Sequence, residues 1–149
     1  MTSMVKIHFR LVQDDDGYPP ASVESLWAQP GANCREYVVD NVPFFACDAT
    51  IGDAVLVSEE KGQRWFKSLV HPSRNSLIRV TFFVHASFEK VNKRLVELGC
   101  STEYSKAHNL LAISVPETVR LSEVQKYLQG EAATGTIDYE EPILRQPAE

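Results

Sequence analysis

Paired cysteines, glycine-rich motifs and long apolar runs are what this 149-residue sequence lacks most clearly. Its three cysteines, Cys34, Cys47 and Cys100, are widely spaced and form no CxxC pair, which argues against a disulfide framework and a zinc knuckle. No segment approaches the roughly 18 apolar residues that span a bilayer, and the stretch 1–9 contains no run of signal-peptide length. We therefore expect a cytoplasmic protein with reduced thiols and no membrane partner.

The seven glycines complete neither a dinucleotide fingerprint nor a P-loop. The net charge is -5, and acidic residues outnumber basic ones in both halves of the chain. Because nucleic-acid affinity depends on clustered Lys and Arg that neutralise phosphates, we expect no nucleic-acid partner. An acidic surface suits a basic protein partner instead.

What is present is an ordinary globular composition, with 44% hydrophobic and 23% charged residues. These proportions exclude disordered, collagen-like and coiled-coil classes. A chain of this length buries about 68–70% of its unfolded surface, so it can form a real core as one domain or as two small ones.

The first half predicts short strands separated by turns. Apolar and basic residues alternate along 5–11, which indicates a half-buried strand with a basic outer face. Further strands are expected at 23–28, 36–39, 54–57 and 64–70, with a hairpin connection at 60–63. Short strands at near-regular intervals favour a small, strongly bent sheet or barrel.

In the second half of the chain the spacing of the apolar residues changes. A continuous β-branched and aromatic run at 77–84 predicts a central strand. Apolar residues at helical spacing, with Ser87 as N-cap and Gly99 just past the end, predict a helix. A second helix is expected where Ser122-Glu123-Val124-Gln125 matches a capping box, interrupted or ended at Gly130.

With strands at 100–104, 110–115 and 136–139, the order over the second half is β-α-β-β-α-β, which is the ferredoxin-like arrangement. The expected fold is therefore α+β: a barrel-like half at 1–75 packed on a ferredoxin-like half at 76–141. The segment 142–149 holds two prolines and little to bury, so we expect a mobile tail.

The spacing of the candidate residues does not fit the known motifs for catalysis or metal binding. Placing Gly17 at the sixth position of a calcium loop puts Val12 and Val23 at ligand positions, so that frame fails. The four histidines share no metal-binding spacing. Cys47 and His71 have no nucleophile elbow around them, and a buried, inert cysteine is the preferred interpretation. We expect no cofactor, no metal and no recognisable catalytic residue.

Two acidic-aromatic clusters remain as candidate partner-binding residues. Their members are Asp14, Asp15, Asp16 and Tyr18 near the start, and Asp138, Tyr139, Glu140 and Glu141 near the end. The ordinary interpretation of both is a polar turn and a solvated strand edge. Glu24 and Trp27 are added as candidates, although an aromatic residue in a strand of a small barrel is usually part of the core.

The chain resembles an uncharacterised bacterial family of about 150 residues that is known only as a domain of unknown function. The blocks that carry the resemblance are Val5–Leu11, Gln13–Pro20, Glu24–Ala28, Asp40–Ala46, Gly52-Asp53, Leu98–Cys100, Leu111–Pro116 and Asp138–Glu141. They span nearly the whole sequence. The resemblance implies that these segments belong together, and it brings no catalytic residue.

The leading hypothesis is a non-enzymatic, acidic inhibitor of the immunity or antitoxin type that neutralises a basic toxin domain such as a nuclease. One alternative is a regulatory module that binds a small molecule between the two halves. The other is an unrecognised hydrolase that uses Glu24 or the Asp138/Glu140 pair.

Overall fold

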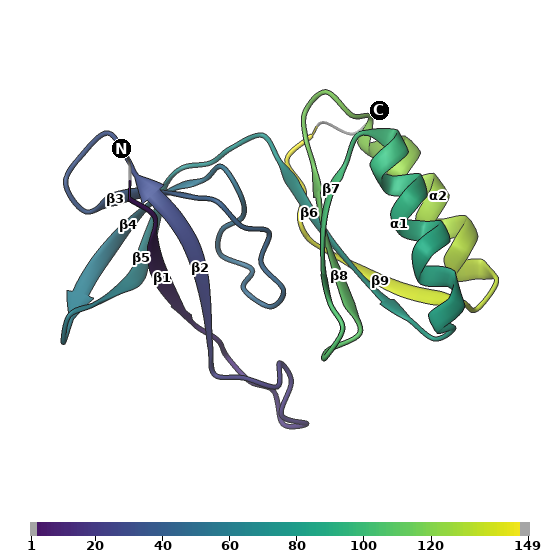
Figure 1. The fold of residues 1–149 in the computed structure, drawn as a ribbon, viewed down its shortest axis with the longest axis horizontal. Helices are drawn as coiled ribbons and strands as arrows, with labels where there is room; N and C mark the ends of the chain where they lie inside the picture. Colours follow the sequence, from purple (N-terminus) through teal and green to yellow (C-terminus); the bar gives the residue numbers. More distant parts are fainter. Residues whose placement is uncertain (1–2, 147–149) are drawn as a thin grey trace. The chain divides into compact units, whose positions relative to one another are not determined.

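The computed structural model describes residues 3–146 and divides the chain into two compact units, Met1–Ser73 and Arg74–Glu149. Each unit has its own cluster of buried hydrophobic residues. In the described residues, unit 1 contains a five-stranded sheet, and unit 2 contains a four-stranded sheet with two α-helices (Figure 1). The structure thus agrees with a mostly β chain in which both helices lie in the second half.

The strands of unit 1 form a closed barrel. Each strand pairs antiparallel with the one before it, and β1 closes the barrel by pairing parallel with β5. The strands are β1 (Val5–Arg10), β2 (Val23–Pro30), β3 (Glu36–Val39), β4 (Ala54–Glu60) and β5 (Gln63–His71).

Alternating burial explains why the barrel forms. Ile7 and Phe9 of β1 are fully buried, and the intervening basic residues point outward, as the alternation predicts. Phe9 stacks on Phe66 of β5, with ring centroids 4.8 Å apart. The β4–β5 hairpin turns at Lys61 and Gly62, where both φ angles are positive, so glycine at the second position avoids backbone strain.

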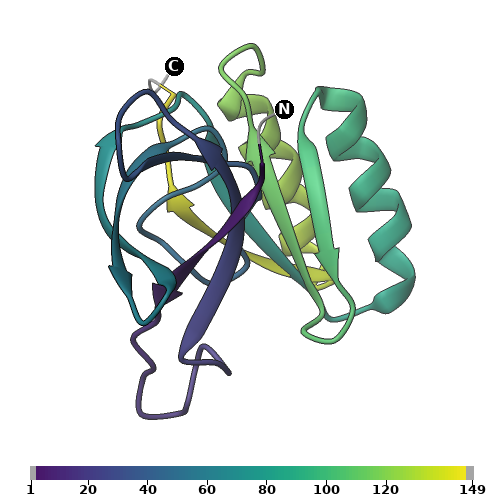
Figure 2. The same ribbon diagram turned by 60° about the vertical axis from the view of Figure 1, so that its left-hand side comes forward.

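Unit 2 is a sheet with helices on one face (Figure 2). The strand order is β7-β8-β6-β9, all neighbouring pairs are antiparallel, and β9 is an edge strand. The elements are β6 (Ser76–Phe82), the 3-10 turn η1 (His85–Ser87), α1 (Phe88–Leu98), β7 (Ser101–Ser105), β8 (Leu110–Val115), α2 (Leu121–Ala133) and β9 (Ile137–Ile143).

The central strand β6 is buried along almost its whole length. Ile78, Val80 and Phe82 belong to the core cluster that also contains the buried residues of both helices. Their neighbours Arg79 and Thr81 alternate with them and therefore point to the opposite face of the sheet. This confirms the predicted central strand.

Helix α1 begins after Ser87 and ends before Gly99, as predicted, but the Ser87 side chain makes no capping bond. Ser87 occupies the N-cap position at the end of η1, and its hydroxyl donates a hydrogen bond to the carbonyl of Val84 at 2.6 Å instead of accepting one from the first turn of α1. Gly99 ends the helix with φ +107, and a Cβ there would lie 2.7 Å from Val119. Glycine is needed at that position for both reasons.

The predicted capping box of the second helix is wrong. Helix α2 begins at Leu121 with Arg120 in the N-cap position, so Ser122 already lies within the first turn. Gly130 neither interrupts nor ends the helix, which continues to Ala133. Packing of its apolar face on the sheet outweighs the roughly 1 kcal/mol that glycine costs in a helix.

The last strand is longer than predicted. It includes Pro142 and Ile143, and Gln146 donates from its side-chain amide to the carbonyls of Val115 and Pro116, at 2.8 and 2.9 Å. The predicted tail boundary at 142 is therefore too early, because β6 and β8 offer partners as far as residue 146. Residues 147–149 lie outside the described part of the chain.

Between residues 3 and 146, neither helix has the length and the apolar content needed to cross a membrane. No disulfide joins the three cysteines, all of which lie in the described part of the chain: Cys100 is buried, whereas Cys34 and Cys47 are exposed. The expectation of a buried Cys47 is therefore wrong, because this residue lies in an irregular surface loop.

Burial raises the pKa of the Cys100 thiol to about 11. Since the thiolate is the reactive form, we expect Cys34 and Cys47 to react promptly with a disulfide reagent at pH 8, and Cys100 to react only after unfolding. Counting the thiols modified with and without denaturant checks this. Prompt modification of all three in the folded protein would contradict the burial of Cys100.

Candidate functional site

The segment between β1 and β2, residues 11–22, forms a projecting loop that we call the acidic loop. Figures 1 and 2 show it extending beyond the ends of the strands. Its base is closed by the backbone N–H of Leu11, which donates to the carbonyl of Ser22 at 2.8 Å. The loop thus continues the β1–β2 ladder before the chain turns.

Asp14 organises the tip of the acidic loop. Its Oδ1 accepts hydrogen bonds from the backbone N–H groups of Asp16 and Tyr18, each at 2.9 Å. Its own N–H donates to the Tyr18 carbonyl at 2.7 Å, and the turn places Gly17 at φ +77. An Asp side chain that bonds to the following backbone is a common way to stabilise a turn. Asp14 is therefore a structural residue of the loop.

The other members of this cluster face solvent. Asp15 and Asp16 are exposed, Tyr18 is 48% exposed, and Val12 at the start of the loop is 93% exposed. The Tyr18 ring meets Phe45 edge-on at 6.1 Å between centroids. The acidic loop therefore presents two carboxylates and two apolar side chains on a hydrogen-bonded frame.

Glu24 holds an irregular loop against the barrel. Its two carboxylate oxygens accept hydrogen bonds from three successive backbone N–H groups, those of Phe44, Phe45 and Ala46, at 2.7, 3.0 and 2.8 Å. With both oxygens engaged, Glu24 acts as a structural acceptor and is poorly placed to serve as a general base.

The segment 40–46 continues along β2 as far as Trp27. The Trp27 N–H donates to the Asn41 side-chain oxygen at 2.7 Å, and the Asp40 N–H donates to the Trp27 carbonyl at 2.8 Å. The blocks 24–28 and 40–46, which carry much of the family resemblance, therefore meet in space. Each block satisfies backbone groups of the other, along the part of β2 that β3 does not reach.

Trp27 is 44% exposed, so the interpretation as a core residue is wrong. Its ring lies on the outer face of the barrel with the Lys6 ammonium 5.0 Å from the ring centroid. A second tryptophan, Trp65 of β5, lies on the other side of β1 beneath the Arg10 guanidinium, 4.0 Å from the ring centroid. Trp65 is only partly exposed. It was not singled out from the sequence, although the alternation along β1 indicated that the residues beside its basic side chains border the outer face of the barrel.

The acidic residues of β9 have partners within unit 2. Glu140 pairs at 3.3 Å with Arg79, whose side chain is 2% exposed. On the opposite face of the strand, Glu141 accepts a hydrogen bond from the Gln125 side chain at 2.6 Å. Tyr139 packs against the core, and burial together with the negative charge of Glu141 raises its pKa.

Asp138 is exposed, and its Oδ1 accepts a hydrogen bond from the N–H of Tyr139 at 2.9 Å. Asp138 and Glu140 share one face of the strand, as the alternation predicts. Most polar side chains of the cluster near the C-terminus thus form bonds within the sheet or with α2. It offers less to a partner than the acidic loop does.

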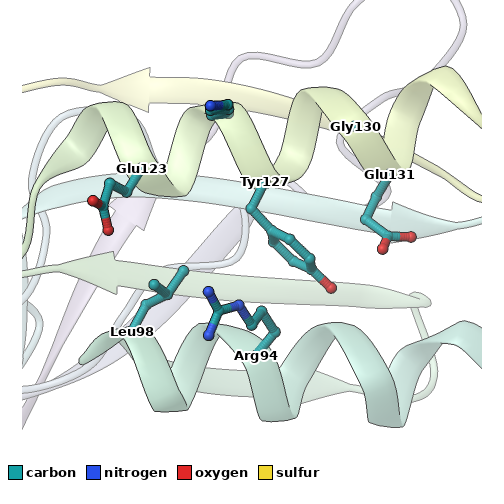
Figure 3. A pocket seen from close by; sticks show the side chains of 7 residues that line it. Arg94, Leu98, Glu123, Tyr127, Gly130 and Glu131 are labelled. Carbon is teal, nitrogen blue, oxygen red and sulfur yellow. The ribbon is translucent and has the colours of Figure 1, made fainter.

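An open groove of about 540 Å³ lies between α1 and α2 (Figure 3). Its lining mixes opposite charges around the Tyr127 ring: Arg94, Leu98, Glu123, Lys126, Tyr127, Gly130 and Glu131. Burial and the adjacent Glu131 carboxylate raise the pKa of Tyr127 to about 12. Within residues 3–146, no group of three or more His, Cys, Asp or Glu side chains is placed to hold a metal ion.

The fold and these surfaces describe an α+β protein with a barrel unit and a sheet-and-helix unit. The model of the family described as "Domain of unknown function (DUF4265)" matches residues 24–139, and the chain belongs to this family. The acidic loop precedes the matched segment. A search of curated proteins gives no match to this chain.

Among solved structures, the chain is similar to one titled "Novel crystal structure of a hypothetical protein from Neisseria gonorrhoeae". The two share 17% sequence identity with a TM-score of 0.76, over 99% of this chain and 98% of the other. At this level of identity the likeness shows the fold alone.

Replacing Glu24 with alanine should lower the free energy of unfolding by about 2 kcal/mol or more, because three backbone donors lose a charged acceptor. Glu24→Gln retains one acceptor oxygen and should lose less. Urea unfolding followed by circular dichroism measures both. The control is Glu59→Ala at an exposed position near the end of β4, for which we expect a change within about 0.5 kcal/mol. Equal effects of Glu24→Ala and Glu59→Ala would show that the three bonds contribute little.

Raising the pH from about 10 to about 12 should destabilise the protein partly through Tyr127. In this range Tyr127 loses its proton in the unfolded chain but keeps it in the folded one, so stability falls as pH rises. Tyr127→Phe removes this contribution, and its melting temperature should fall less over the same range. Parallel curves for parent and variant would mean that the pKa of Tyr127 is not raised.

Proposed function

We propose that this chain is a non-enzymatic, acidic binding protein of the immunity or antitoxin type, which neutralises a basic toxin domain such as a nuclease. The observation that carries the proposal is the acidic loop. It projects from the barrel, it is organised by Asp14, and it exposes Asp15, Asp16 and Tyr18.

Pre-organisation supports this role. A recognition loop that is already hydrogen-bonded loses little conformational entropy when it binds, so more of its contact energy appears as affinity. The Asp14 bonds, and a bond from the Gln13 side chain to the Pro19 carbonyl at 3.0 Å, provide such a frame.

The chemistry of the loop favours a basic partner. Two exposed carboxylates attract a cationic surface and speed the encounter, and exposed aromatic side chains are the residue type that most often anchors an interface. Tyr18 and Val12 are the candidates for that anchor, with Trp27 further along β2. Within this proposal, Glu24 and the β9 residues support the fold and make at most secondary contacts.

We further propose that unit 2 has the ferredoxin-like arrangement. The antiparallel strand order β7-β8-β6-β9, with α1 and α2 following β6 and β8, supports this assignment. Three described cysteines with no disulfide among them, two of them exposed, support action in the reducing cytoplasm.

The proposal predicts that a product of a neighbouring reading frame in the source genome is toxic alone and is rescued by this chain. Asp15→Asn with Asp16→Asn should slow association and weaken its salt dependence, since charge steering is lost. Tyr18→Ala should mainly speed dissociation. Growth rescue and binding kinetics on a biosensor measure these effects.

The matched control is Glu89→Gln with Glu97→Gln, which removes two exposed carboxylates from α1 and changes the net charge equally. It should bind and rescue like the parent. The proposal fails if no neighbouring product is toxic and rescued, or if the control weakens binding as much as the loop variants do.

A further inference from the structure

The outer face of the barrel gathers basic and aromatic side chains around β1. Lys6, His8 and Arg10 alternate outward along this strand, and the pairing places β2 on one side of it and β5 on the other (Figure 1). The two tryptophans of the chain, Trp27 and Trp65, come from those flanking strands. We call these five residues the β1 strip.

Direct contacts connect the β1 strip into one surface. His8 lies 5.2 Å from the Trp65 ring, and its Nδ1 is 2.6 Å from the hydroxyl oxygen of Ser25. Lys6 and Arg10 lie over Trp27 and Trp65, respectively. Basic side chains of β1 therefore lie next to tryptophan rings of β2 and β5, although these residues are far apart in the sequence.

The charge of the strip is available to a ligand. Arg10 pairs with Glu60 at 3.2 Å, but both side chains are more than half exposed, and such surface pairs contribute little. Lys6 is exposed as well. The strip is thus a basic island on a chain whose net charge is -5.

Spacing and chemistry indicate the class of ligand. Alternate residues of a strand are about 6.7 Å apart, which is close to the repeat of an extended nucleotide chain. Basic side chains that follow a backbone, with aromatic rings on which bases stack, are the features that bind single strands without sequence preference. A polyanion without rings would use only half of this surface.

We propose that the β1 strip binds a short single-stranded segment of nucleic acid, with Lys6, His8 and Arg10 facing phosphates and Trp27 and Trp65 facing bases. This site is separate from the acidic loop and goes beyond the proposed function. It also departs from the expectation of no nucleic-acid partner, because overall charge does not reveal how a fold clusters its basic side chains.

Fluorescence anisotropy of labelled dT12 tests the proposal on the full chain. With two or three phosphates contacted, raising salt from 50 to 200 mM should weaken binding about 7- to 18-fold. Lys6→Ala should weaken binding and reduce this salt dependence, whereas Trp27→Ala should weaken binding about 5-fold or more with the salt dependence retained. Both positions are exposed, and circular dichroism verifies that the variants fold.

The matched control is Lys93→Ala at an exposed position of α1, which should bind dT12 like the parent. Heparin supplies anionic charge without bases, and an equally charged acidic peptide supplies it without either phosphates or bases. The proposal is overturned if dT12 does not bind, if Lys6→Ala and Trp27→Ala bind like Lys93→Ala, or if heparin or the peptide competes as well as unlabelled dT12.

Discussion

The contact on which unit 1 most depends is the Glu24 carboxylate with three consecutive backbone N–H groups. Beyond the reach of β3, strand β2 has no neighbouring strand on this side, and the segment 40–46 takes that place. Because one side chain accepts hydrogen bonds from three backbone donors, an irregular segment is held along a barrel strand with these donors satisfied. The position of Phe45, and with it the Tyr18 edge contact, follows from this arrangement.

This contact also separates structural from available carboxylates. Asp14, Glu24 and Glu140 all resemble binding or catalytic residues in the sequence, yet each has an intramolecular partner. Asp14, Asp15 and Asp16 are all exposed, and Asp14 differs in that its carboxylate accepts the backbone hydrogen bonds that organise the loop. An acidic cluster is therefore not one functional unit, since neighbouring carboxylates in it can have opposite roles.

Sequence periodicity predicted the local elements well. The alternation of Ile7 and Phe9 and the helix that ends before Gly99 follow from burial of one face and from the need for a left-handed residue at the helix end. The start of α2 was predicted poorly, because a serine such as Ser122 can lie within the first turn of a helix as well as before it, and only tertiary structure decides which. At α1 the predicted N-cap position of Ser87 is correct, although its side chain bonds to Val84 instead of to the helix.

The candidate site was harder to predict for a similar reason. Glu24 and the N–H groups it binds are about 20 residues apart, and no local pattern identifies them as partners. Likewise, Trp27 and Trp65 become neighbours of one strand only when the barrel closes. The sequence shows directly which residues are acidic or aromatic. Only the folded structure shows which of them remain exposed.

The composition of β9 has a consequence for how the protein behaves at high concentration. An edge strand presents unpaired backbone groups that invite strands of other molecules, and charges or a proline on the edge discourage such pairing. Asp138, Glu140 and Glu141 lie on this strand, and Pro142 lacks an N–H where the register shifts. The acidic end of the sheet thus acts as a safeguard against aggregation, whatever partner the protein binds.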